Sequence, residues 1–123
     1  MTSPQTRRAL ASTEYEICRK ILEAFGDTDL MEQLENAEVV VGRLPMFLDL
    51  VVNPSQPRST RKTGPLPINT IVVSDAGTEY GEILIWISDG YLSGIEHPWW
   101  SEDMPGAWPD PTNVKIVGWS TLI

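Results

Sequence analysis

The stretch that most restricts the fold of this chain is Glu82 to Glu96, which reads EILIWISDGYLSGIE. Two runs rich in β-branched and aromatic residues flank the dipeptide Asp89-Gly90, and this combination favours a two-residue hairpin turn. We therefore predict antiparallel strands over 82–88 and 91–96. In the simplest register Ser88 pairs with Tyr91 and Ile87 with Leu92, and Gly94 then lies opposite Ile85.

That register gives the hairpin two unequal faces. The face predicted to enter the core carries Ile83, Ile85, Ile87 and Leu92. The other face carries Leu84, Trp86, Tyr91, Ser93 and Ile95, and it is too apolar for ordinary solvent-exposed surface. We expect the following segment of chain, or another molecule, to cover it.

The first third of the chain has helical periodicity. Ser3-Pro4 is one possible start, and Thr13 with Glu16 has the spacing of a capping box. Gly26 is placed to end the first helix, and a short second helix should follow. The predicted helical region is 4–36, with one apolar stripe on Ile17, Ile21, Leu22 and Phe25 and a second on Leu30, Leu34 and Ala37.

After Asn36 the pattern changes to the period of two that is typical of strands. Strands are predicted over 39–41, 46–52, 68–74 and 114–119, in addition to the hairpin. Residues 53–67, which we call the basic loop, contain four prolines and three bases, and this excludes a central strand. We expect the basic loop to be a solvated excursion, with phosphate binding as a weaker alternative.

These elements predict an α+β fold. Two N-terminal helices should pack on one face of a curved, mostly antiparallel sheet of five to six strands, within a single domain spanning 1–123. The sheet region would be 38–123. No apolar run is long enough for a membrane helix, the N-terminus lacks the apolar core of a signal peptide, and the lone Cys18 cannot form an internal disulfide. We therefore expect a cytoplasmic protein, with Cys18 as a structural thiol.

The net charge of −8 is unevenly distributed. Residues 1–66 hold nine acids and eight bases, whereas 67–123 hold eight acids and one base, Lys115. Such an acidic half would repel a phosphate backbone, so we do not expect nucleic-acid binding. A basic partner would be attracted instead, although net acidity also simply keeps a protein soluble.

The segment after the hairpin, HPWWSEDMPGAWPDPTN, brings tryptophan, proline and carboxylates together. Its prolines make it stiff, and large aromatic anchors with a charged rim are typical of protein-binding surfaces. We predict that at least one tryptophan packs inward and at least one is exposed. The predicted partner-binding residues are Trp99, Trp100, Trp108, Glu96, Glu102, Asp103, Tyr91 and Asp89.

Catalytic arrangements are poorly supported by the sequence. His97 is the only histidine, and neither Ser93 nor Ser101 has a nucleophile-elbow motif around it. Zinc would need more nitrogen or sulfur ligands than the chain offers, and the spacing of a calcium loop is missing. We expect a protein that is not an enzyme and needs no cofactor or metal, with a metal-assisted hydrolase built on Glu96 and His97 as the weakest alternative.

Residues 82–112 resemble the C-terminal part of small uncharacterised actinobacterial proteins. The hairpin followed by a glutamate also resembles the tails of immunity proteins from polymorphic toxin and contact-dependent growth inhibition systems. This resemblance implies a cytoplasmic inhibitor that binds the toxin domain delivered by a neighbouring cell. The acidic, tryptophan-bearing surface adds the expectation that this cognate domain is basic, and a small interaction or ligand-binding module is the alternative. The resemblance implies nothing about the basic loop or the oligomeric state.

Overall fold

The computed structural model describes residues 6–42 and 44–119, so the predicted Ser3-Pro4 start lies outside the described residues. Two helices are present, α1 (Ser12–Phe25) and α2 (Thr28–Leu34), with a short 3-10 helix, η1 (Pro111–Asn113). The strands are β1 (Arg7–Ala9), β2 (Glu38–Val40), β3 (Phe47–Val51), β4 (Gly64–Pro65), β5 (Ile68–Val73), β6 (Glu79–Gly81), β7 (Leu84–Ser88), β8 (Tyr91–Glu96) and β9 (Val114–Trp119).

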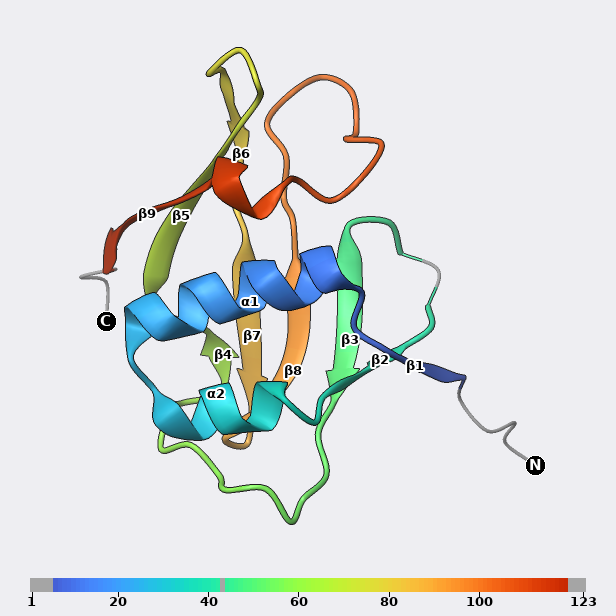
Figure 1. The fold of residues 1–123 in the computed structure, drawn as a ribbon, viewed down its shortest axis with the longest axis vertical. Coiled ribbons are helices and arrows are strands. Elements are labelled where there is room, and N and C mark those ends of the chain that lie inside the picture. The colour runs from blue at the N-terminus through green and yellow to red at the C-terminus, as the bar shows by residue number, and fades with distance from the viewer. Residues whose placement is uncertain (1–5, 43, 120–123) are drawn as a thin grey trace.

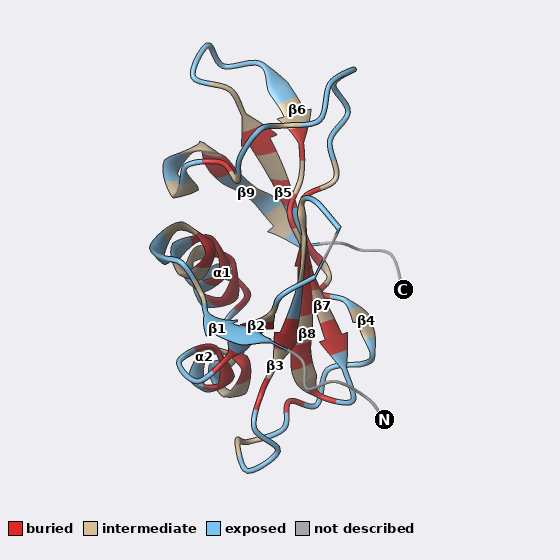
Figure 2. Ribbon diagram, turned by 90° about the vertical axis from the view of Figure 1, so that its right-hand side faces the viewer, coloured by how far each residue is buried: buried red, intermediate tan, exposed pale blue. Residues whose placement is uncertain are grey.

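The predicted α+β class is confirmed. Six strands form one antiparallel sheet in the order β1-β2-β3-β8-β7-β4, and α1 and α2 cover one of its faces (Figures 1 and 2). A second sheet, which the sequence did not separate from the first, has the order β6-β5-β9 and lies at one end of the long axis. The core lies between the helices and the strands, and the predicted stripe of α1 is buried there together with Leu30 and Leu34 of α2.

Helix α1 begins at Ser12, between the two predicted starts. Residues 7–9 are not helical, because β1 pairs with β2 along the edge of the larger sheet. The N-cap is Ala11, whose N–H donates to the Glu14 carboxylate over 2.8 Å, so the cap lies two residues before the predicted Thr13. Burial raises the pKa of Glu14, but hydrogen bonds from Arg8 and Ala11 outweigh it and leave that pKa below its usual value. The predicted C-cap is confirmed, since Gly26 has a φ of 88°.

The hairpin turns where predicted, but its register shifts after two pairs. Asp89 and Gly90 have positive φ angles of 52° and 84°, which is the geometry of a type I′ turn. A β-bulge then places Ser93 as an extra residue, so that Trp86, not Ile85, lies opposite Gly94. This shift turns Ile95 to the core face, where it pairs with Ile85 and is buried, contrary to the predicted outward position.

The two sheets are joined by a continuation of the same hairpin. Beyond β7 and β8 the two segments of the hairpin stay side by side. The N–H of Glu82 donates to the Pro98 carbonyl, and the N–H of Trp100 donates to the Tyr80 carbonyl. Where the sheets diverge, the buried hydroxyl of Thr70 accepts from the N–H of Ile83 and donates to its carbonyl, in place of ladder hydrogen bonds. The hairpin therefore carries residues 97–110, which we call the tryptophan loop, out to the end of the molecule opposite the Asp89-Gly90 turn (Figure 1).

The basic loop is held against the body of the molecule, which differs from the predicted solvated excursion. Ser59 is buried; its N–H donates to Gly90 and its hydroxyl donates to Asp27. Gln33 is fully buried, and its amide nitrogen donates to the carbonyls of Pro57 and Gly90. The basic loop thus packs over the hairpin turn. Within this loop, β4 pairs with β7 at the edge of the larger sheet.

Candidate functional site

The tryptophan loop starts from a rigid base. Trp99 forms an antiparallel bridge with Gly81, and the Trp100 N–H donates to the Tyr80 carbonyl over 2.7 Å. These contacts hold residues 99–100 alongside the end of β6, at the edge of the smaller sheet. The aromatic positions are therefore fixed by main-chain hydrogen bonds, which lowers the ordering cost of binding a partner.

Large apolar side chains are exposed along the tryptophan loop. Trp100 is 55% exposed, Met104 47% and Trp99 36%. Glu102 and Asp103 lie between them and are also exposed. Among the described residues neither carboxylate forms an ion pair. The result is an apolar patch with uncompensated negative charge within it.

Trp108 has a different role from Trp99 and Trp100. It is half-buried and packs against the core, and its ring centroid lies 6.0 Å from that of His97. The expectation that one tryptophan would pack inward while others are exposed agrees with these positions. Trp119, at 51% exposure, stacks on Phe25 with a centroid distance of 4.3 Å and lies on β9, outside the tryptophan loop.

The structure separates the predicted partner-binding residues into three places. Trp99, Trp100, Glu102 and Asp103 lie together on the tryptophan loop. Glu96 lies back on β8, where its carboxylate accepts from the Trp86 indole over 3.1 Å.

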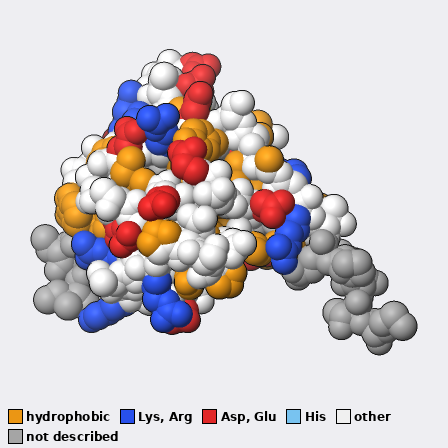
Figure 3. All heavy atoms as spheres, turned by 60° about the horizontal axis from the view of Figure 1, so that its bottom comes forward, with side chains coloured by type: hydrophobic (Ala, Val, Ile, Leu, Met, Phe, Trp, Pro, Cys, Tyr) orange, Lys and Arg blue, Asp and Glu red, His pale blue; other side chains and the backbone are white. Residues whose placement is uncertain are grey.

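Asp89 and Tyr91 lie at the opposite end of the hairpin and contact the basic loop. Arg58 pairs with Asp89 at 3.5 Å and covers the Tyr91 ring at 5.6 Å. The Tyr91 hydroxyl donates to the Pro54 carbonyl. Viewed from this end, acidic and basic side chains are interspersed (Figure 3). Asp89 therefore has a basic neighbour at this end, whereas Glu102 and Asp103 form no ion pair with any described residue.

A shallow pocket of about 470 Å³ lies beside the tryptophan loop. Three segments far apart in the sequence form its walls: the β5–β6 turn, the tryptophan loop and η1. The lining residues are Ser74, Asp75, Tyr80, Ser101, Pro105, Gly106, Ala107, Asp110 and Asn113. Sequence reasoning missed this pocket, because Asp75 and Asp110 are brought together only by the pairing of β5 with β9.

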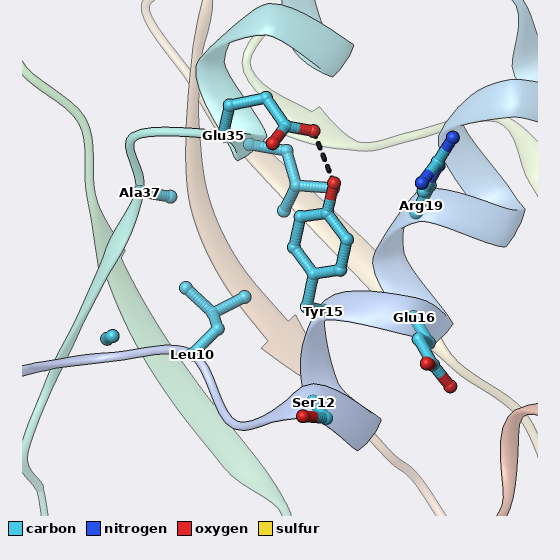
Figure 4. Close-up of a pocket in the computed structure, with 9 residues that line it drawn as sticks. Leu10, Ser12, Tyr15, Glu16, Arg19, Glu35 and Ala37 are labelled. Atoms are coloured by element: carbon cyan, nitrogen blue, oxygen red, sulfur yellow. Dashed lines mark hydrogen bonds between the residues drawn. The ribbon is translucent and has the colours of Figure 1, made fainter.

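A second pocket, of about 350 Å³, lies between the start of α1 and the end of α2 (Figure 4). The Tyr15 hydroxyl donates to the Glu35 carboxylate across it, and this bond raises the pKa of Tyr15. Glu16 and Arg19 also line it, so the pocket presents both acidic and basic groups. Nothing in this pocket singles out one class of ligand.

The catalytic alternatives do not gain support from the geometry. His97 is fully buried; its Nδ1 is 2.9 Å from the Glu82 carbonyl, and its Nε2 has no hydrogen-bond partner among the described residues. Ser101 is exposed and donates to the Asp103 carbonyl rather than to an imidazole. Burial raises the pKa of the Cys18 thiol far above its usual value, as expected for a structural cysteine.

The described residues were also compared with the requirements of a metal site and of a membrane-spanning helix. Across residues 6–42 and 44–119, no group of three or more histidine, cysteine, aspartate or glutamate side chains is arranged to hold a metal ion. In the same part of the chain no helix has the length and apolar character needed to cross a bilayer.

Comparison of the chain with protein-family models, with curated proteins and with solved structures found no match.

Proposed function

We propose that this protein is a non-enzymatic immunity protein that binds and neutralises a basic toxin domain through the tryptophan loop. The observation that carries the proposal is the exposed group of Trp99, Trp100 and Met104, presented on a main-chain-anchored loop together with Glu102 and Asp103. Exposed indoles of this kind act as binding anchors, and unpaired carboxylates attract a positively charged surface. The resemblance of the hairpin and the glutamate after it to the tails of immunity proteins favours a toxin as the partner.

Neutralisation by such a surface needs no chemistry. The negative end of the molecule would accelerate encounter with a basic domain, and burial of the indoles would slow dissociation. A toxin that acts on nucleic acid presents a basic surface to its substrate, and an acidic protein seated there competes with that substrate.

Co-expression is the direct test of the proposal. The C-terminal domain of a large secreted toxin encoded directly upstream would be expressed with and without this chain. Survival of the cells and co-purification of the two proteins are expected. Unchanged toxicity together with no co-purification would refute the proposal.

Trp100→Ala is expected to weaken partner binding by about 2 kcal/mol, or roughly 30-fold, because the largest exposed anchor is removed. The dissociation constant is measured by calorimetry with the purified toxin domain. Trp119→Ala is the matched control, since Trp119 is similarly exposed but lies on β9. Equal losses in the two variants would show that the tryptophan loop is not the binding surface.

Reversing charge at Glu102 and Asp103 to lysine is expected to lower the association rate about tenfold at low salt, with little change in dissociation rate. Stopped-flow fluorescence of the tryptophans at two ionic strengths measures both rates. A Glu16→Lys/Glu32→Lys variant changes the net charge equally on the exposed helical side. If both pairs slow association alike, net charge alone and not the tryptophan loop steers the partner.

A further inference from the structure

We infer that the pocket beside the tryptophan loop receives an arginine side chain of the basic partner. This inference rests on the proposed function and adds a specific anchor to it. The pocket combines a volume of about 470 Å³ with two carboxylates and an aromatic ring, on the same end of the molecule as Trp99 and Trp100.

The two carboxylates are held in place by η1 and each keeps one oxygen for a ligand. Asp110 is the N-cap of η1, and its Oδ1 accepts from the N–H and hydroxyl of Thr112. Asp75, on the β5–β6 turn, accepts through Oδ1 from the Asn113 amide over 2.9 Å. The Oδ2 atoms have no hydrogen-bond partner among the described residues, and neither carboxylate forms an ion pair there.

The remaining lining suits a flat cation. Tyr80 contributes a half-buried ring, Ser101 a hydroxyl, and Gly106 and Ala107 main chain without bulky side chains. Burial raises the pKa of Tyr80, and the nearby negative charge of Asp75 raises it further. A guanidinium group stacks on aromatic rings and presents several donors in a fork, which matches a pocket lined by a ring and by carboxylates.

Two lysines near the pocket donate to main-chain carbonyls of η1, and neither forms an ion pair with a described residue. Lys20 donates to the Pro111 carbonyl over 3.0 Å, and Lys115 donates to the Thr112 carbonyl over 2.8 Å. Lys20 is the smallest of the influences on the pKa of Asp110, which is lowered mainly by the Thr112 bonds. Space and negative charge thus remain for an external cation.

A titration of the ¹⁵N-labelled chain with N-acetyl-Gly-Arg-Gly-amide tests the inference. The peptide is expected to shift the amide resonances of Ser101, Gly106 and Ala107 with roughly millimolar affinity. The same peptide with citrulline in place of arginine keeps the shape but lacks the charge, and it should cause no saturable shift. A lysine peptide is expected to bind more weakly than the arginine peptide.

The matched variants separate local contact from general charge. Asp75→Asn/Asp110→Asn keeps the Oδ1 acceptors and hence the fold, and should weaken arginine-peptide binding at least tenfold. Glu102→Gln/Asp103→Asn removes the same charge outside the pocket and should change it less than twofold. Absence of saturable shifts, equal weakening in both variants, or lysine binding as tight as arginine would each overturn the inference.

This titration is independent of the toxin domain. Trp100→Ala should leave arginine-peptide binding unchanged while it weakens toxin binding. In the parent protein, peptide binding without any toxin binding would contradict the proposed function alone. Retained toxin binding without peptide binding would contradict the pocket alone.

Discussion

Replacing Gln33 by alanine is expected to lower the free energy of unfolding by about 4 kcal/mol, the largest effect of a single substitution that we expect. The side chain is fully buried, and its amide oxygen accepts from the Leu92 N–H over 2.9 Å. Its nitrogen donates to the carbonyls of Pro57 and Gly90. Removing the amide leaves main-chain groups of both the basic loop and the hairpin turn without hydrogen-bond partners. Each such buried group costs roughly 1–3 kcal/mol.

Chemical denaturation monitored by circular dichroism measures this change. A loss of that size corresponds to a fall in midpoint temperature of roughly 15 °C for a domain of this length. Glu32→Ala, at the neighbouring exposed position of α2, should change stability by less than about 0.5 kcal/mol. A Gln33→Ala protein as stable as the Glu32→Ala control would mean that the hydrogen bonds between Gln33 and the basic loop contribute nothing to stability.

Gly81→Ala is expected to lower the free energy of unfolding by about 3 kcal/mol and to loosen the base of the tryptophan loop. A methyl group on Gly81 would lie 2.5 Å from the Pro98 carbonyl oxygen and 2.7 Å from Cε1 of His97. The obstruction is main chain on one side and a buried ring on the other, so neither can yield without breaking the bridge between Gly81 and Trp99. Partner affinity should fall together with stability, because the indoles lose their fixed positions.

Gly106→Ala is the control within the tryptophan loop. A methyl group on Gly106 would meet nothing within 4 Å, so its stability should stay within about 0.5 kcal/mol of the parent protein. Hydrogen exchange at the Trp100 amide reports on the base of the tryptophan loop directly, and it should accelerate in Gly81→Ala alone. If protection of this amide is unchanged in Gly81→Ala, the close approach of Pro98 and His97 does not hold the tryptophan loop.

Short-range pattern was sufficient to predict much of the fold. The helical stripe from Ile17 to Phe25, the end of α1 at Gly26 and the turn at Asp89-Gly90 depend on neighbouring residues, and all three are confirmed. The α+β class followed from the order of these elements. The burial of Gln33 could have been predicted in the same way, because it lies three residues after Leu30 on the buried stripe of α2. A polar side chain buried there must find hydrogen-bond partners.

Other features depend on which strands meet, and no local pattern encodes that. The bulge at Ser93 reversed the predicted position of Ile95, because one extra residue exchanges the two faces of a strand. Asp89 and Tyr91 were grouped with the tryptophans by closeness in sequence, whereas an extended strand carries its ends far apart. Asp75 and Asp110 became neighbours because β9 returns beside β5. Hydrophobic spacing therefore determined the elements of this protein, and the pairing of distant strands determined the site, since contacts across a sheet depend on register and not on distance along the chain.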